Sequence, residues 1–280
     1  MYFLNINKPK GITSFDVVRV LRKKLGIKQI GHSGTLDPLA SGVMQVAVGN
    51  ATKLLDYLDS DKEYIASIKF GYVSTTFDEE GEKTFVSKPD FNVDKLIETM
   101  NSFLGKTKQI PPKYSAIKVN GKKLCDIARK NPDNDIEIAS REIEIYSIEL
   151  IEFHNDFAKI KVFCKKGTYI RSLVNDIGQK LGCGAYMTDL IRTKAGNFMI
   201  EKADLLDSDN YSNLNPLDVL NLSKYELSNE EYGKIMNGNF IGNKGGFINS
   251  PILLTKDYKL VSVAILSDNL IKPKKTFKGE

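Results

Sequence analysis

Residues 158–181 read AKIKVFCKKGTYIRSLVNDIGQKL and carry the clearest structural pattern in the chain. Apolar and polar residues alternate from Ala158 to Lys165, which predicts a half-buried strand. Gly167 breaks that alternation, and the apolar spacing after it predicts a helix. The buried face of this helix would consist of Ile170, Leu173, Val174, Ile177 and Leu181. The stretch is therefore predicted to form a strand followed at once by a helix.

Similar patterns lie on both sides of this stretch. Residues 142–153 form a second predicted strand that pairs with it, and Lys62 to Val73 alternates with Tyr64, Ala66, Ile68 and Phe70 on one face. Helices and strands come in runs and do not alternate strictly, so we expect an α+β fold. Its core would be a mixed or antiparallel central sheet with flanking helices.

Two helices are expected before residue 110. Thr13 or Ser14 is predicted to cap the first, and Gly26 to end it. Its apolar face would contain Phe15, Val18, Leu21 and Leu25. The second is predicted to run from about Asn92 to Gly105, with an apolar stripe made of Leu96, Ile97, Met100 and Leu104.

The amino-acid composition changes after about residue 210, where Asn, Ser and Gly become frequent. Residues 252–254 and 260–265 are apolar and flank Lys256 to Lys259, which predicts a β-hairpin. We therefore divide the chain into a main domain, residues 1–210, and a small β region, residues 211–280. The second part is short for an independent core, so it is expected to lean on the first.

Composition narrows the class of protein. The chain has 280 residues with 41% hydrophobic residues and a formal net charge of +5, which suits a folded protein and permits a polyanionic partner. No stretch approaches the roughly 20 apolar residues of a membrane span, and the first residues lack the apolar run of a signal peptide. We expect a cytoplasmic protein without membrane association.

Cysteine and histidine are scarce. Cys125, Cys164 and Cys183 are scattered, and only His32 and His154 accompany them. This pattern predicts neither a disulfide framework nor a metal site.

Residues 31–42, GHSGTLDPLASG, are the first candidate for chemistry. Their glycines allow a bulky substrate to approach the backbone, and Asp37 is the lone carboxylate among them. A free aspartate has a pKa near 3.9 and is ionised at pH 7. Asp37 is therefore a candidate nucleophile, base or charge stabiliser if a cation holds it in place.

Arg171 is the candidate cation, because it lies near the start of a helix after a glycine-bearing turn. A surface salt bridge is the alternative interpretation of this residue. Tyr64 could stack on a base or simply pack at the head of a strand. His32 could contact a base or make only a local hydrogen bond.

A basic segment follows the second predicted helix. Residues 105–125 read GKTKQIPPKYSAIKVNGKKLC and contain six lysines and no acid. Together with Tyr114, the lysines Lys113, Lys118 and Lys122 could follow a phosphate backbone, each neutralised phosphate adding about one unit to the salt slope of binding. A solvated, lysine-rich connection is the alternative.

In their order along the chain, these segments resemble the tRNA pseudouridine-55 synthase family of the TruB type. The resemblance runs from the first residues to about Phe198. The matching segments are NKPKGITSFDVV, GHSGTLDPLASG, the ATK at residues 51–53, DKEYIASIKFG, DEEG, IPPKYSAIKVNGKKL, CKKGTYIRSLVNDIGQKLGCGA and LIRTKAGNF. The C-terminal stretch resembles, more weakly, a shortened PUA-like RNA-binding appendage.

The resemblance implies an enzyme that isomerises the T-loop uridine at position 55 of tRNA to pseudouridine, without a cofactor. By position, Asp37 matches the catalytic aspartate, Arg171 its paired arginine and Tyr64 the tyrosine against the base. The matches to substrate-binding positions are His32, Tyr169 and Leu190.

The resemblance also implies that the uridine leaves the T-loop to reach this site, at a cost of a few kcal/mol. The partner is tRNA, bound in part by a basic insertion around residues 105–130. We expect a monomer with no obligate protein partner. Residues alone leave open whether Asp37 attacks the sugar, attacks the base or takes a proton from the ribose.

Two rival functions remain besides that of a tRNA pseudouridine synthase. A tRNA-folding chaperone would use the same surface without turnover, and a metabolic enzyme would act on free uridine nucleotides. The combination of Asp37, Tyr64 and Arg171 argues against a chaperone alone. The basic segment argues against the metabolic enzyme, because a mononucleotide needs no extended phosphate track.

Overall fold

A computed structural model of the chain describes residues 1–115, 118–119, 122–124, 127, 138–249 and 251–278. The predicted hairpin is present, because β10 (Arg141–His154) pairs antiparallel with β11 (Phe157–Cys164). Helix α4 (Ile170–Lys180) follows after the turn at Gly167, as the sequence predicts. The strand expected over residues 62–73 is β4 (Lys62–Phe70), continued after Gly71 by the short β5 (Tyr72–Ser74).

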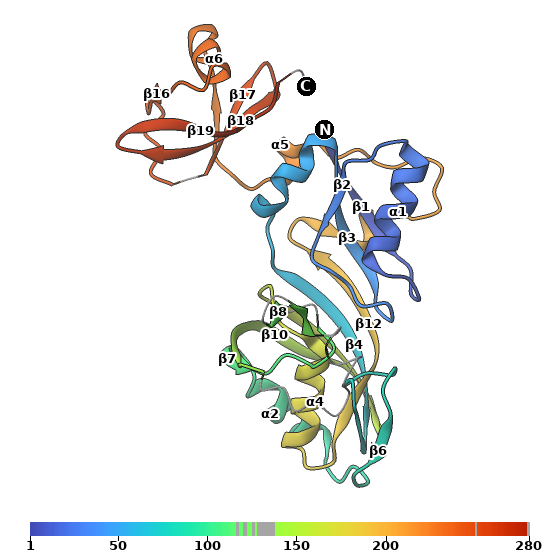
Figure 1. Cartoon of the computed structure of the whole chain (residues 1–280). Helices are drawn as coiled ribbons and strands as arrows, with labels where there is room; N and C mark the ends of the chain where they lie inside the picture. Colours follow the sequence, from blue (N-terminus) through green and yellow to red (C-terminus); the bar gives the residue numbers. More distant parts are fainter. Residues whose placement is uncertain (116–117, 120–121, 125–126, 128–137, 250, 279–280) are drawn as a thin grey trace.

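A large sheet organises the first two thirds of the chain (Figure 1). Among the described residues it has ten strands, and its neighbours are antiparallel except for two parallel pairs, β1 with β14 and β3 with β12. The order is β14 (Asp204–Leu205), β1 (Tyr2–Lys8), β3 (Ser41–Val48), β12 (Ala185–Ala195), β4, β11, β10 and β7 (Gly105–Gln109), with β2 (Ile30–Ser33) on β3 and β13 (Phe198–Met199) on β12. The prediction of an α+β fold with a mixed central sheet is confirmed.

Strand β12 joins two halves of this sheet. It pairs in parallel with the start of β3, where Ile191 lies opposite Ser41, and antiparallel along the length of β4. Figure 1 shows β4 and β12 as long ribbons that run side by side between the upper and lower parts of the sheet. The N-terminal strands and the β10–β11 hairpin therefore share one continuous scaffold.

Helix α1 (Ser14–Leu25) covers the N-terminal strands. Thr13 caps it with a capping box, and Gly26 ends it in the left-handed conformation with φ = 68°. Val17, Val18 and Leu21 are buried against β1 and β3. The predicted buried position of Phe15 is wrong, since this residue is 55% exposed and Val17 takes the inward place.

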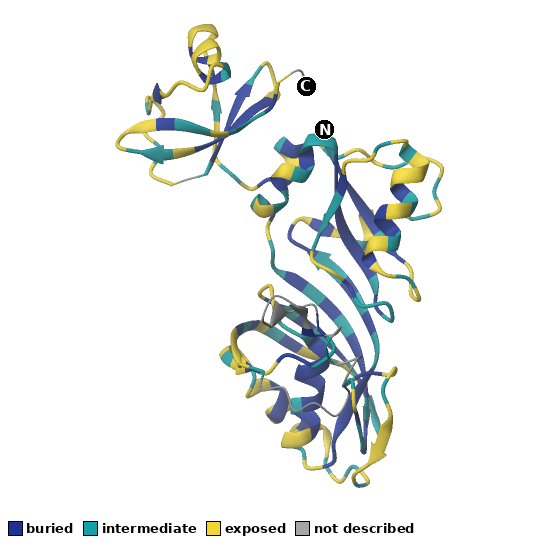
Figure 2. Cartoon of the chain, viewed as in Figure 1, coloured by how far each residue is buried: buried dark blue, intermediate teal, exposed yellow. Residues whose placement is uncertain are grey.

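Helices α2 (Val93–Asn101) and α4 cover the other half of the sheet (Figure 1). Leu96 and Met100 of α2 are buried as predicted, whereas Ile97 is 39% exposed and Leu104, beyond the end of the helix, is 43% exposed. The helix ends four residues before Gly105, because the chain turns at Ser102 toward β7. Figure 2 shows buried residues on β1 and β3 in the upper part of the sheet as well as on β4, β12 and α4.

The remaining elements of the main part are short. They are η1 (Gly49–Tyr57), β6 (Lys83–Phe85), β8 (Lys118–Val119), β9 (Lys122–Lys123) and η2 (Ile200–Lys202). Strand β6 pairs with β5, and β8 pairs with β9.

A second sheet forms the C-terminal part. In the described residues it has five strands, β15 (Lys224–Glu226), β17 (Ile252–Lys256), β18 (Lys259–Ser267), β19 (Leu270–Thr276) and β16 (Ile241–Gly242), accompanied by α5 (Pro216–Val219) and α6 (Asn229–Met236). The predicted hairpin is β17 with β18. Leu253, Leu260 and Phe277 share a hydrophobic cluster with Phe3 and Val43 of the first sheet, so this part leans on the main one. Its PUA-like character and the division at residue 210 stay predictions.

None of the helices in the described residues is both long and apolar enough to cross a membrane.

Candidate active site

Asp37 lies in the loop between β2 and β3. Hydrogen bonds from neighbouring segments fix the residues on either side of it, Leu36 and Pro38. The Ser14 hydroxyl, at the start of α1, accepts from the backbone N–H of Leu36 at 2.9 Å and donates to its carbonyl at 3.1 Å. The Pro38 carbonyl accepts from the backbone N–H of Gly11 at 2.8 Å. Gly34, with φ = 73°, supplies the left-handed turn that leads into the loop. The backbone on both sides of Asp37 is thus fixed to the start of α1 and to the segment before it.

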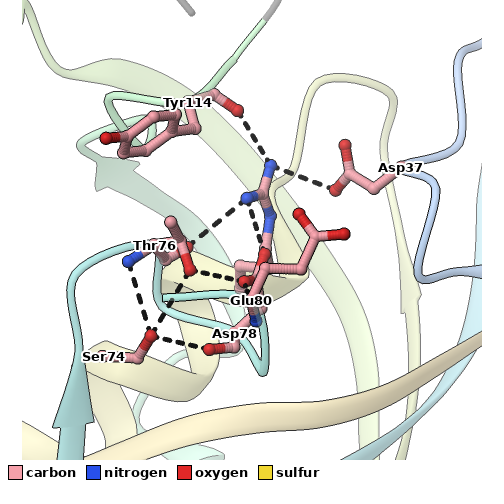
Figure 3. A network of polar contacts seen from close by, with 7 residues as sticks. Asp37, Ser74, Thr76, Asp78, Glu80 and Tyr114 are labelled. Carbon is pink, nitrogen blue, oxygen red and sulfur yellow. Dashed lines mark hydrogen bonds and ion pairs between the residues drawn. The ribbon is translucent and has the colours of Figure 1, made fainter. Parts of the chain in front are cut away.

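Arg171 comes from the first turn of α4, and its guanidinium lies beside the Asp37 carboxylate. Its Nη2 atom is 3.0 Å from Asp37 Oδ2, and its Nη1 atom is 2.8 Å from Asp78 Oδ2. Figure 3 shows the Asp37 carboxylate on one side of the network and Asp78 on the other. The predicted partnership of Asp37 and Arg171 is therefore realised in the structure. Their attraction is roughly 5 kcal/mol at an effective dielectric of about 20, before desolvation and the partial exposure of Asp37 are subtracted.

Further acceptors fix the guanidinium plane of Arg171. Nη2 also donates to the Tyr114 carbonyl at 3.1 Å, and Nη1 to the Thr76 carbonyl at 3.4 Å. The Arg171 side chain is 6% exposed, so these contacts are shielded from water. A buried guanidinium with acceptors on both nitrogens has little freedom to turn, and it directs the Asp37 carboxylate accordingly.

Asp78 is itself held by a tight loop after β5. Its Oδ1 atom accepts from the Thr76 hydroxyl and from the backbone N–H of Glu80, and its carbonyl accepts from the Ser74 hydroxyl at 2.6 Å (Figure 3). The Asp78 side chain is 1% exposed. The loop therefore presents one rigid, fully enclosed carboxylate to Arg171.

The electrostatic setting of Asp37 is a balance of opposing effects. Burial raises the pKa of its carboxyl, Arg171 lowers it, Asp78 raises it and Lys8 lowers it, and the pKa is raised on balance. The Asp37 side chain retains 37% of its exposure, so the carboxylate is still open to a ligand.

Tyr64 and Leu190 lie together in the hydrophobic core beside the Asp37 loop. Both belong to the cluster that includes Leu36, and they are 8% and 5% exposed. Burial raises the pKa of the Tyr64 phenol, the Arg192 charge lowers it, and the pKa is raised on balance. The phenol is therefore protonated at neutral pH.

His32 and Tyr169 flank this arrangement. His32 is on β2, and burial and the Arg192 charge lower the pKa of its imidazole, which leaves it neutral at pH 7. Tyr169 directly precedes α4, and its backbone N–H and C=O are both bonded to the Gln109 side chain, at 2.8 and 3.0 Å. Tyr169 is half-buried, so its position is set by β7 as well as by α4.

Only part of the basic segment can be placed. Lys113 and Tyr114 are half-buried, and the Tyr114 carbonyl contacts Arg171 as described. The backbones of Lys118 and Lys122 lie on β8 and β9, but their side chains are outside the described residues. The RNA-binding role of these lysines stays a prediction.

Comparison with known proteins assigns the chain to a family. Residues 22–170 match the model of the TruB family pseudouridylate synthase N-terminal domain, and residues 171–214 match the tRNA pseudouridylate synthase B C-terminal domain. This chain belongs to the TruB family. It is 46% identical over 229 residues to the tRNA pseudouridine synthase B of Clostridium novyi, covering 81% of this chain and 76% of that one. The corresponding protein of Mycoplasma mobile is 41% identical over 276 residues, covering 97% and 93%.

Solved structures agree on the fold. A crystal structure of a Cbf5-Nop10-Gar1 complex superposes with a TM-score of 0.74 at 25% identity, covering 98% of this chain and 84% of that one. The predicted membership of the TruB type and the prediction that the chain is a tRNA pseudouridine synthase are confirmed.

Sequence reasoning missed two buried residues of this TruB site, Asp78 and Arg192. Asp78 is the first residue of the DEEG motif, but nothing in a run of four acidic or small residues indicates which carboxylate is buried. Arg192 lies in the LIRTKAGNF motif and is fully buried, where an arginine on a strand would be expected to reach solvent. Among the described residues, no group of three or more His, Cys, Asp or Glu side chains is arranged to hold a metal ion.

Proposed function

We propose that this chain isomerises the uridine at position 55 in the T-loop of tRNA to pseudouridine. The observation that carries the proposal is the buried Arg171 between two carboxylates, 3.0 Å from Asp37 and 2.8 Å from Asp78. Asp78 and two carbonyls hold the guanidinium, so the more exposed Asp37 is the carboxylate that remains available to a substrate.

In the proposed reaction, the N1 to C1′ bond of the uridine breaks and a C5 to C1′ bond forms. The C5 proton leaves to solvent, and N1 gains a proton. The product has the same atoms as the substrate and the same oxidation state, so the reaction requires no cofactor. Asp37, in its ionised form, acts on the nucleoside, and Arg171 fixes the direction of its carboxylate.

The uridine is proposed to leave the T-loop and lie against Tyr64. As a protonated, buried phenol, Tyr64 offers an aromatic face and a hydroxyl donor to the base, and Leu190 supplies an apolar wall. His32, neutral at pH 7, contacts RNA from β2, and Tyr169 contacts the substrate beside Arg171. Extrusion of the base costs a few kcal/mol, which stacking and phosphate contacts offset.

The segment around residues 105–130 binds the phosphate backbone of the tRNA, and the C-terminal region acts as a short PUA-like RNA-binding part. The enzyme is proposed to work as a cytoplasmic monomer without an obligate protein partner.

The central experiment is Asp37→Asn, assayed by tritium release from C5-labelled uridine in a T-loop RNA. We expect the variant to release no tritium and to bind tRNA within a few fold of the wild type. Asp156→Asn is the matched control, since Asp156 is a partly exposed aspartate paired with Lys69 on the turn between β10 and β11. Normal turnover by Asp37→Asn would overturn the proposal, and turnover of free uridine nucleotides by the wild type would replace tRNA as the substrate.

A second experiment tests the partner. Replacing Lys113, Lys118 and Lys122 together with Ala should weaken tRNA binding and flatten its salt dependence by up to about three units, one for each lost phosphate contact. An unchanged slope would place the RNA elsewhere on the molecule. Pseudouridine mapping in tRNA from a deletion strain would then identify the modified position directly.

A further inference from the structure

Arg192 is a fully buried arginine on β12 that the proposed reaction leaves without a role. Its relative exposure is 0%, and its side chain is the largest among the fully buried residues in the described part of the chain. In the described residues, no carboxylate forms an ion pair with it. Burying an unpaired charge costs several kcal/mol, so folding stability alone is a poor reason for an arginine here.

The hydrogen bonds of Arg192 go to the two ends of the loop that carries Asp37. Nε donates to the Val43 carbonyl at 2.6 Å, and Nη2 donates to the Gly34 carbonyl at 3.1 Å. Gly34 precedes Asp37 where the chain leaves β2, and Val43 follows it at the start of β3. One guanidinium therefore ties together the entry and the exit of the loop.

The backbone of Arg192 makes the same connection. Arg192 lies opposite Gly42 in the parallel pairing of β12 with β3, and a Cβ atom at Gly42 would collide with the Arg192 carbonyl. The close approach holds β12 against the exit of the Asp37 loop with no side chain between them. Gly42 has φ = 107°, a conformation that favours glycine.

The third contact of Arg192 is with the strand that carries Tyr64. Arg192 and Tyr64 are direct cross-strand neighbours in the antiparallel pairing of β12 with β4. The Arg192 charge also offsets part of the effect of burial on the Tyr64 pKa. A side-chain hydrogen bond between Arg192 and Tyr64 also lowers this pKa, so the guanidinium contacts the Tyr64 side chain itself.

We infer that Arg192 is a positioning residue that sets the Asp37 loop at a fixed place relative to Tyr64. The inference rests on the proposed function. Two directional donors on a planar guanidinium reach carbonyls on both sides of Asp37, a geometry that the single ammonium of lysine does not reproduce. Asp37 is then held by two systems: Arg171 directs its carboxylate, and Arg192 fixes the backbone beneath it.

The test uses two substitutions at this position. Arg192→Lys keeps the positive charge and much of the volume, and Arg192→Met removes the charge. Rates are measured as single turnovers of T-loop RNA with enzyme in saturating excess, and are normalised to the fraction of protein that binds RNA. We expect both variants to bind RNA within about 3-fold of the wild type and to lose roughly 10- to 100-fold in the single-turnover rate, because a displacement of about 1 Å can cost that much.

Arg22→Lys is the matched control. Arg22 also donates to a backbone carbonyl, that of Ile30 at the start of β2, at 3.1 Å, but it lies on the exposed side of α1. Its single-turnover rate should equal that of the wild type. The inference would be overturned if the Arg192 variants gave less folded protein but kept the wild-type single-turnover rate for each bound complex. Failure of both variants to fold would overturn it too, since Arg192 would then serve folding alone.

The activity of the wild type distinguishes a failure of the proposed function from a failure of the positioning role. If the wild-type chain does not isomerise T-loop uridine, the proposed function fails. If it does and the Arg192 variants match its rate, only the positioning role fails.

Discussion

Asp78→Asn is the most direct test of the buried network. Asp78 and Arg171 are 1% and 6% exposed and 2.8 Å apart, and removing one member of such a pair costs about 3 to 5 kcal/mol when the other is left alone. Arg171 keeps Asp37 at 3.0 Å and two carbonyls, so we expect a loss of about 2 to 3 kcal/mol in the free energy of unfolding. The asparagine oxygen can still accept a hydrogen bond from the Thr76 hydroxyl, so the substitution alters only the interaction of residue 78 with Arg171.

The catalytic effect of Asp78→Asn follows from the same geometry. Without its stronger anchor, Arg171 no longer fixes the direction of the Asp37 carboxylate, and we expect a loss of roughly 100-fold in kcat. The pKa gives a second, independent result. Asp78 raises the pKa of Asp37, so the variant should have a lower Asp37 pKa. Activity would then persist to lower pH than in the wild type.

Unfolding in urea, tritium release at saturating RNA and a pH profile of kcat/KM test these results together. Asp156→Asn is the control, because the pair of Asp156 with Lys69 is partly exposed and should contribute less than about 1 kcal/mol. The reasoning is refuted if Asp78→Asn unfolds like this control and keeps the wild-type rate.

Three more outcomes are expected. Gly42→Ala should destabilise the fold by about 2 to 4 kcal/mol, because a Cβ at this positive φ collides with the Arg192 backbone. Gly233→Ala in α6, where a Cβ meets nothing within 4 Å, should instead stabilise it by about 0.5 to 1 kcal/mol. Urea unfolding of both variants checks these two values. Burial lowers the pKa of Lys62 from 10.5 to about 8, so between these values the unfolded chain binds more protons than the native one. The stability of the wild type relative to Lys62→Met should therefore rise as the pH increases through that window, and a flat difference would contradict it. The raised pKa of Asp37 predicts that the acid limb of the wild-type kcat/KM profile lies above the pKa of a free aspartate, near 3.9. A limb at or below that value would show that burial does not govern this carboxyl.

Much of the fold could be predicted from local patterns. The β10–β11 hairpin, α4 and the inward face of β4 follow from alternation and helical spacing, because each of these elements is buried on one side only. Phe15 was misplaced because helical spacing alone does not say which of two adjacent apolar stripes faces the sheet, and Val17 fills the inward position.

The candidate site was predictable where charge pairing is a strong constraint. Asp37 and Arg171 lie 134 positions apart, and their pairing came from the resemblance and from the need of a carboxylate for a cation. Asp78 and Arg192 were not predictable, since both depend on burial created by distant strands. An acidic loop and a strand arginine are ordinary surface features until the sheet around them is known.

The late position of β12 in the sequence determines when the large sheet can be completed during synthesis of the chain. Residues 185–195 are synthesised after both β3 and β4, so until they leave the ribosome the two halves of the sheet have no connecting ladder between them. β4 then presents an open edge along most of its length, which is a hazard for aggregation in a nascent chain. We expect a chain that ends before this strand to contain both Asp37 and Arg171 and yet to be inactive, because no strand would then join β3 to β4.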